Sequence, residues 1–237
     1  MSRLSVKLDH IATLRQARRA GYPDPITAAA IAEMAGAEGI TVHLRGDRRH
    51  VQERDLEILQ RTVQTRLNVM MACNQETVRL ALNLGPAMVT FVPERSDELT
   101  TESGLDLDRN RDAISKATSL LKGSGIGVSL FIDPDVEMVK AAHKLDVDAV
   151  ELNTGRYADA KQEIDRFRIY DRISASARAA HKLKLVVAAG HGLNYHNIKD
   201  IRYIQEIEEY NVGHAIVARA VLLGMDRAVR EMADLLK

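Results

Sequence analysis

The sequence predicts a single-domain (β/α)8 barrel, the TIM-barrel fold, with extra helices, spanning residues 1–237. Eight short runs rich in Val, Ile and Leu alternate with longer amphipathic runs along the chain. Strands that are separated by helices pair in parallel, and such units in one domain of about 250 residues are typical of a closed barrel. No Gly/Ser/Pro-rich linker interrupts the alternation, so a second domain is not expected.

An open, doubly wound parallel sheet is the alternative fold for this alternation. The dinucleotide-binding version of that fold carries a G-x-G-x-x-G fingerprint after its first strand. No such motif follows the first strand here, so the barrel is favoured.

The first half of the chain starts with the alternating run SVKLD at 5–9, a strand in which Lys7 and Asp9 share one face. A polar stretch follows it. Asp24 before Pro25 is typical of a helix start. The further elements predicted in this half are helix 24–37, strand 39–44, helix 53–65, strand 66–73, helix 74–85 with Asn74 as its cap and Gly85 at its end, and strand 87–92.

The second half continues the pattern, with two departures. Residues 94–108 form a polar connection too long for a routine turn, and long loops in compact domains are often lids or binding loops. The helical run within 158–182 is too long for a minimal barrel, so we expect two helices there or a surface used for oligomerisation. The other predicted elements are helix 109–125, strand 126–133, helix 134–146, strand 148–155, strand 182–192, helix 195–208, a last strand within 210–217 and helix 225–237.

Composition and charge exclude several classes of protein. Lys plus Arg and Asp plus Glu both number 33, so no global field favours nucleic acid or an anionic membrane. The longest apolar runs have roughly eight residues, far short of a membrane span, and no signal-peptide pattern is visible. Cys73 is the only cysteine, which excludes an intrachain disulfide and fits a reducing cytoplasm. We interpret Cys73 as a buried apolar residue rather than a nucleophile.

Reactive residues gather at the C-terminal ends of the predicted strands, where a barrel places its chemistry. The sixth strand ends in Glu151 and Asn153, and arginines follow the first two strands. Imidazole titrates near neutral pH and guanidinium binds phosphate through two hydrogen bonds, so the set suits acid–base chemistry on a phosphorylated substrate. Five of the eight histidines lie at or just after these ends: His10, His43, His50, His191 and His214.

The segments AGHG and VGH after the last two strands predict a phosphate site. Backbone N–H groups at helix N-termini bind anions, and the loops after strands seven and eight are the common phosphate site of such barrels. Other interpretations stay open at this stage. The segment DRRH could be a solvated charged loop, His10 or His214 could cap a helix, and Asp133 before Pro134 is read as a helix cap. A metal site is conceivable from three histidines, although no H-x-H or HExxH spacing supports it: His43, His191 and His214.

Several longer motifs occur in order over essentially the whole chain: DHIATLRQAR, YPDP, GITVHLRGDRRH, SLFID, TGRYADAK, AGHGLNYHN and VGHAIVARAV. Together they closely resemble the pyridoxine 5'-phosphate synthase family of bacterial vitamin B6 biosynthesis. The resemblance implies a (β/α)8 barrel with added helices, assembled as an octamer built from dimers. It implies a transferase-type synthase that condenses 1-deoxy-D-xylulose 5-phosphate with 3-amino-2-oxopropyl phosphate, releasing phosphate and water. It implies no metal and no organic cofactor.

The resemblance also assigns roles to residues of this chain. It places the catalytic base at His43, the proton donor at His191 and the transition-state carboxylate at Glu151. Contacts to the pentulose phosphate fall on Asp9, His10, Arg45, His50 and Thr100, the last of which lies in the loop expected to be a lid. Contacts to the amino-ketone phosphate fall on Arg18, Gly192, Gly213 and His214, and Lys7 occupies a further substrate-binding position.

The chain departs from the family pattern inside the barrel. Lys7 stands where the family has an asparagine, and Met70 stands where it has a glutamate that acts as a second base. A thioether accepts no proton, so one proton transfer lacks its agent. Asn153 and Ala188 also replace a histidine and an asparagine of the family motifs.

Three hypotheses follow from these departures. The first is a working synthase in which His43, Glu151 or Asp9 replaces the missing base. The second is a diverged paralogue that acts on a related phosphorylated ketone, with Lys7 forming a Schiff base or simply pairing with a carboxylate. The third is a non-catalytic protein that binds phosphorylated ligands.

Overall fold

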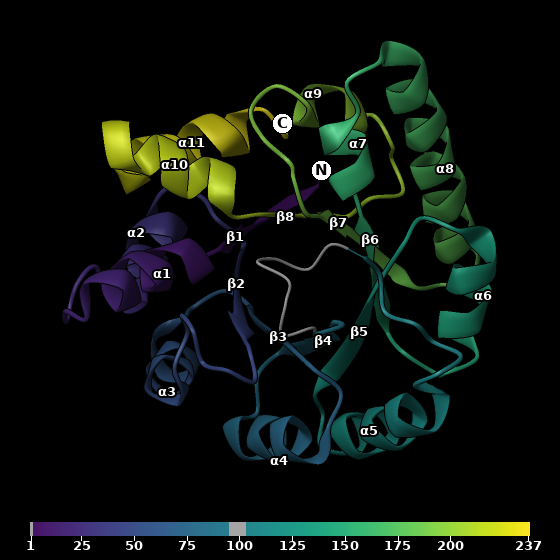
Figure 1. Cartoon of the computed structure of the whole chain (residues 1–237), viewed down its shortest axis with the longest axis horizontal. Helices are drawn as coiled ribbons and strands as arrows, with labels where there is room; N and C mark the ends of the chain where they lie inside the picture. The colour runs from purple at the N-terminus through teal and green to yellow at the C-terminus, as the bar shows by residue number, and fades with distance from the viewer. Residues whose placement is uncertain (1, 95–102) are drawn as a thin grey trace.

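The computed structural model describes residues 2–94 and 103–237. Eight parallel strands form a closed barrel in chain order, and β8 pairs with β1 to close it (Figure 1). The strands are β1 Arg3–Lys7, β2 Gly39–Leu44, β3 Leu67–Met71, β4 Met88–Phe91, β5 Gly127–Ile132, β6 Ala149–Asn153, β7 Val186–Gly190 and β8 Glu209–Val212. The predicted barrel is therefore confirmed.

Helices surround the barrel in an outer ring (Figure 1). Two helices rather than one lie in the β1–β2 and β6–β7 connections and after β8, which confirms the expected extra helices. The helices of the described residues are α1 Asp9–Arg18, α2 Pro25–Met34, α3 Glu53–Thr62, α4 Gln75–Leu84, α5 Arg111–Gly123, α6 Val136–His143, α7 Gly155–Asp159, α8 Glu163–Lys182, α9 Ile198–Ile201, α10 His214–Leu223 and α11 Met225–Asp234. Within these residues, no helix is long and apolar enough to cross a membrane.

The strands alternate between an apolar outer face and a polar inner face. In β2, Ile40 and Val42 belong to the large apolar core beneath the helices. Thr41 lies between them and points the other way, where its Oγ1 donates to Oδ1 of Asn211 on β8 at 3.1 Å. Ser5 Oγ lies 2.8 Å from the same hydroxyl. The outer face therefore drives packing, while the inner face is a hydrogen-bonded polar network beneath the functional end of the barrel.

Helix boundaries follow the predicted capping residues where the sequence carries a clear cap. Asp24 accepts the Ile26 N–H at the start of α2. Asn74 accepts the Thr77 N–H at the start of α4, and that helix ends at Gly85 with a left-handed φ of 65°. These side chains satisfy N–H groups that have no partner within the helix.

Two expectations from the sequence differ from the structure, and a third leaves the end of a strand open. The polar stretch after β1 is helix α1, whose few apolar residues, such as Ile11 and Ala12, are buried against the core. The last strand, predicted within 210–217, ends at Val212, and Ile216 and Val217 of the same segment form the buried face of α10. A short apolar run does not distinguish a strand from a buried helix turn. The predicted helix 195–208 is reduced to the single turn α9.

Two further expectations are resolved by local contacts. Asp135, not Asp133, caps α6 by accepting the Glu137 N–H. Asp133 instead accepts hydrogen bonds from the Gly104 N–H and the Asn153 amide. The long run within 158–182 is mainly the single helix α8, because α7 ends at Asp159, so the expectation of two helices within this run is wrong. Most of the predicted lid at 94–108, including Thr100, lies outside the described residues.

Candidate active site

A cavity of about 530 Å³ lies at the C-terminal ends of the strands. The predicted site residues that line it come from β1, β2, β6 and the segments after β1, β2, β7 and β8, and are Lys7, Asp9, His10, His43, Arg45, His50, Glu151, His191, Gly192, Gly213 and His214. The structure therefore brings together residues that lie up to about two hundred positions apart in the chain, as a barrel does.

Arg18 does not line this cavity. Asp9 and His10 begin α1 beside the cavity, and Arg18 is the last residue of the same helix. At 1.5 Å per residue the helix carries it roughly 14 Å away, where its side chain is exposed. Thr100 lies outside the described residues, so its predicted contact is not tested.

Asp9 anchors the backbone of the predicted catalytic base. Its Oδ1 accepts the His43 N–H at 2.7 Å, and its Oδ2 lies 3.3 Å from Lys7 Nζ. Burial raises the pKa of Asp9, but Lys7, the neighbouring histidines and the His43 N–H together outweigh burial and hold this pKa below its ordinary value. Asp9 is therefore ionised at neutral pH.

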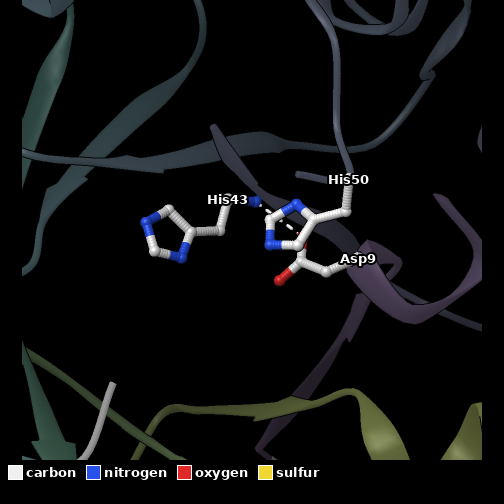
Figure 2. A group of neighbouring side chains, drawn as sticks. All are labelled: Asp9, His43 and His50. Atoms are coloured by element: carbon white, nitrogen blue, oxygen red, sulfur yellow. Dashed lines mark hydrogen bonds between the residues drawn. The ribbon is translucent and has the colours of Figure 1, made fainter. Parts of the chain in front are cut away.

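His43 and His50 face one another above Asp9 (Figure 2). Burial lowers the pKa of both imidazoles, that of His50 to about 4. His50 Nδ1 accepts the Val51 N–H at 2.8 Å, so the neutral ring of His50 carries its proton on Nε2. Both rings are therefore neutral near pH 7, with His50 held as a hydrogen-bond donor.

The possible metal ligands that lie together in the structure differ from the three histidines that the sequence suggested. Ligand atoms of Asp9, His43 and His50 lie within 4.8 Å of one another, whereas the trio His43, His191 and His214 forms no such group among the described residues. The Lys7 ammonium lies 3.3 Å from the Asp9 carboxylate, so it already supplies the positive charge next to this group. We interpret the group as acid–base machinery with an internal cation.

A buried ion pair holds the segment that carries His50. The Arg15 guanidinium donates two hydrogen bonds of 2.7 Å to the two Asp55 oxygens, and a third, at 3.3 Å, to the His50 carbonyl. Arg15 is therefore a supporting residue rather than a phosphate ligand. The DRRH segment is only partly a solvated loop, because Arg48 pairs with two surface glutamates while Arg49 and His50 line the cavity.

Glu151 is fully buried at the inner face of β6. Burial raises the pKa of Glu151 to about 7, against the opposing effect of Lys7. Asn211 Nδ2 donates to Oε2 at 2.8 Å. A Cβ at Gly190 would lie 2.2 Å from Oε1, so only glycine leaves room for this carboxyl group. Glu151 can both accept and release a proton near neutral pH.

His191 has an unusual backbone conformation. Its φ is +78° and that of Gly192 is +73°, in the left-handed region that few residues other than glycine adopt. Thr154 Oγ1 donates to the His191 carbonyl at 2.5 Å and stabilises this turn. A Cβ at Gly155 would lie 2.6 Å from the His191 ring, so glycine there makes space for the imidazole. Backbone strain of this kind is typical of functional sites.

Lys7 and Met70 are in contact. Lys7 Nζ lies 3.0 Å from Met70 Sδ in addition to its ion pair with Asp9. Met70 packs with Val92 and Phe131 in a small apolar cluster separate from the main core. The amine is thus held between a carboxylate and a thioether, which agrees with the ion-pairing interpretation of Lys7.

His10 and His214 meet across the cavity rim. Their rings pack edge to face with centroids 5.1 Å apart. They belong to the first turns of α1 and α10, whose N-termini therefore open toward the cavity. This arrangement suits an anion, since helix N-termini carry positive partial charge.

Sequence reasoning did not single out Glu94 and Asn211. Glu94 Oε1 is within hydrogen-bond distance of His43 Nε2, at 3.1 Å, and Asn211 donates to Glu151. Both residues could have been found from position: Glu94 follows the fourth strand, and Asn211 lies at an inward-facing place in the last one.

Comparison with known proteins places the chain in a family. The family model described as "Pyridoxal phosphate biosynthesis protein PdxJ" matches residues 4–237. A pyridoxine 5'-phosphate synthase of Pelobacter propionicus is 55% identical over 100% of this chain and 99% of the relative. One of Syntrophotalea carbinolica is 54% identical over 99% of this chain and 98% of the relative.

Solved structures with little sequence similarity share the fold alone. A phosphoribosyl anthranilate isomerase from Thermus thermophilus superposes with a TM-score of 0.60 at 12% identity, over 99% of this chain and 98% of that chain. The corresponding enzyme from Thermotoga maritima gives 0.58 at 10% identity, over 100% and 98%. On the family match and the identity to its relatives, the chain belongs to the PdxJ family of pyridoxal phosphate biosynthesis proteins.

Proposed function

We propose that this chain is a pyridoxine 5'-phosphate synthase. It condenses 1-deoxy-D-xylulose 5-phosphate with 3-amino-2-oxopropyl phosphate, closing the pyridine ring with release of phosphate and water. The convergence of His43, Glu151 and His191 on one cavity at the strand ends supports this proposal most strongly. Relatives with this name are 52–55% identical to the chain, which favours the synthase over a diverged paralogue or a binding protein.

Two anion-binding features serve the two phosphorylated substrates. Arg45 and Arg49 reach the cavity from the segment after β2. Gly213 and His214 present the N-terminus of α10 on the side of β8, next to the Gly192 turn. Guanidinium groups and helix N-termini both bind phosphate effectively. If each feature binds one phosphate group, the arginines hold one substrate and the α10 N-terminus holds the other.

The buried imidazoles and carboxyl group divide the proton transfers. Burial keeps the pKa of His43 low, so at neutral pH this ring is a free base that can remove a substrate proton. Burial also lowers the pKa of His191. A phosphate dianion bound beside His191 raises that pKa again, so the ring becomes protonated in the complex and can donate to the leaving phosphate.

Glu151 is our candidate for the role of the family's second base, because Met70 stands where the family has that glutamate. Its pKa of about 7 lets it take and return a proton within one turnover, which a thioether cannot do. Lys7 holds Asp9 ionised and donates to a substrate oxygen. We do not assign Lys7 a covalent role, because its amine is paired with Asp9.

The test is turnover of the two substrates by the purified protein. We expect equal amounts of pyridoxine 5'-phosphate and phosphate, and a loss of at least about 100-fold in kcat for His43→Gln. His143→Gln is the matched control, because His143 lies on the exposed face of α6. Binding of both substrates with no product would instead support a binding protein. Borohydride trapping of a ketone phosphate on Lys7 would support the paralogue.

We also propose that the protein is cytoplasmic and assembles as a homo-octamer built from dimers, as the family resemblance implies. Arg18 and Thr100 stay proposed substrate contacts. Light scattering after gel filtration tests the assembly, and a particle of one chain, 26.3 kDa, would contradict it.

A further inference from the structure

We propose that Glu94 is a positioning residue that holds the His43 imidazole in one tautomer, with the ring nitrogen Nδ1 as the base that faces the cavity. No motif singled out Glu94, and its side chain does not line the cavity. The kinetic part of the inference rests on the proposed synthase function, whereas the tautomer does not.

Glu94 bridges two segments of the active end of the barrel. It follows β4, and its carboxylate reaches the segment after β2. Oε1 lies 3.1 Å from His43 Nε2, and Oε2 accepts the Gly46 N–H at 2.9 Å. Because both oxygens are engaged, the carboxylate cannot rotate freely. The His43 backbone is held independently by Asp9, so backbone and ring are both fixed.

The tautomer follows from the chemistry of these partners. Burial raises the pKa of Glu94, but the hydrogen bonds from His43 and Gly46 outweigh burial and keep this pKa below its ordinary value. An ionised carboxylate only accepts, so the proton of the neutral His43 ring must be on Nε2. The lone pair is then on Nδ1. Figure 2 shows this second ring nitrogen on the side of His50.

His50 complements that arrangement. Its Nδ1 accepts the Val51 N–H, so its Nε2 carries a proton and faces His43 (Figure 2). A substrate hydroxyl between the two rings can accept from His50 Nε2–H and lose its own proton to His43 Nδ1. Donor and acceptor are thereby fixed before substrate binds, which lowers the reorganisation needed in the transition state.

Glu94 also stabilises His43 after proton transfer. Burial disfavours the imidazolium, and the adjacent carboxylate favours it. A third group that orients a base and pairs with its charged form is a recurring arrangement in enzymes. The charged and titratable groups that face the two rings are Lys7, Asp9, Arg45 and Glu94.

The first test needs no turnover. Nitrogen-15 magic-angle-spinning NMR of the histidine-labelled protein at pH 7.5, assigned with His43→Gln, should show His43 protonated at Nε2 alone. In Glu94→Gln the amide can donate as well as accept, so a mixture of both tautomers is expected. Glu76→Gln is the control. Glu76 is an exposed carboxylate that pairs with Arg48, so its substitution should leave His43 unchanged. A wild-type His43 that carries its proton on Nδ1 would overturn the inference.

The second test is kinetic. For imidazoles bound to metals, losing the group that orients the ring costs about 10- to 100-fold, and we expect a similar loss of kcat in Glu94→Gln with little change in KM. The acidic limb of kcat/KM should move to lower pH, since Glu94 raises the pKa of His43. Wild-type kcat and an unmoved limb would contradict the positioning role. A wild-type chain without turnover would contradict the proposed function and leave the NMR result to decide the role of Glu94.

Discussion

The positive charge of Lys7 acts on most of the other ionisable groups that line the cavity. Its ammonium lies 3.3 Å from Asp9, on the inner face of β1, and no other lysine lines the cavity among the described residues. Its positive charge lowers the pKa values of six neighbours: Asp9, His10, His43, His50, Glu151 and His191. Lys7 thus helps to keep a carboxylate ionised, and it adds to the larger effect of burial that keeps the imidazoles neutral.

Replacing Lys7 with methionine should shift the pH profile of the enzyme. Without the ammonium, the pKa values of Asp9 and His43 rise, because a favourable charge is lost from one and a repulsive charge from the other. We expect the acidic limb of kcat/KM to move to higher pH, opposite in direction to Glu94→Gln. Lys140→Met, on the exposed face of α6, should leave the profile unchanged. The measurement is kcat/KM between pH 5 and 9, and an unmoved limb would contradict this role for Lys7.

The buried Glu151 carboxyl group should make the folded state less stable at high pH. Its folded pKa of about 7 is above its ordinary value of 4.5, so the folded chain binds the extra proton between these values. The unfolding free energy therefore falls as pH rises through this range, by roughly 3 kcal/mol at most. Glu151→Gln removes this pH-dependent loss of stability. The difference in unfolding free energy between the variant and wild type should therefore shift in favour of the variant from pH 5 to pH 8, and the variant should lose activity. Urea unfolding of both proteins at pH 5 and pH 8 tests this prediction. If the difference in unfolding free energy between variant and wild type is the same at the two pH values, the prediction is wrong.

At the scale of elements, close packing explains why certain backbone positions lack a side chain. Gly190 ends β7 next to Glu151 on β6, and a Cβ there would come within 2.2 Å of the carboxyl oxygen. The strand cannot move away because it is hydrogen-bonded on both sides in the barrel. Glycine at this strand end is therefore required by the site rather than by the turn.

Gly190→Ala should lower both the melting temperature and kcat, because the added methyl group displaces Glu151 or the strand. Overpacking of this kind costs about 1–3 kcal/mol. Gly123→Ala is the matched control: Gly123 lies in α5, and a Cβ there has nothing within 4 Å. It should stabilise the helix by up to about 1 kcal/mol and leave kcat unchanged. Differential scanning calorimetry with parallel assays tests the pair, and equal effects of both variants would refute the packing argument.

The sequence predicts an element well where one local signal dominates. The cap residues Asp24 and Asn74 mark helix starts, and the alternation of β2 marks a strand. Prediction fails where local and tertiary signals compete. Ile216 and Val217 continue the apolar run of β8, yet they are the buried face of α10, and only the packing of that helix decides between the two. The polar α1 is stabilised mainly by contacts that lie outside its own sequence.

The candidate site divides in the same way. Residues at strand ends, such as His43 and His191, could be predicted because the fold rule says where they must lie. The pairing of Glu94 with His43 could not, because it joins segments 51 positions apart and depends on the loop path after β4. The supporting role of Arg15 was equally invisible, since an arginine that binds Asp55 and one that binds phosphate look alike in sequence.

At the scale of the whole molecule, the site and the barrel are one cooperative unit. The cavity is lined from β1, β2, β3, β5, β6 and β8 and from the segments after β1, β2, β7 and β8, so a ligand there contacts most of the closed sheet. The inner polar network from Ser5 through Thr41 and Asn211 reaches Glu151 directly. Binding at the cavity should therefore stabilise the entire fold rather than one segment.

The product pyridoxine 5'-phosphate should raise the melting temperature more than pyridoxine does. A ligand at 100 times its Kd stabilises the folded state by about 2.7 kcal/mol, which corresponds to roughly 5–10 °C for a domain of this size. Pyridoxine lacks the phosphate that the guanidinium groups and the α10 N-terminus would bind, so it should stabilise much less at the same concentration. Arg45→Met should reduce the difference between the two compounds, because Arg45 is buried at the cavity wall and supplies positive charge to it. Thermal scans at fixed ionic strength separate this effect from general salt screening. If both compounds shift the transition equally, the affinity of the cavity comes from ring contacts, and the phosphate-binding role of these two features would have to be abandoned.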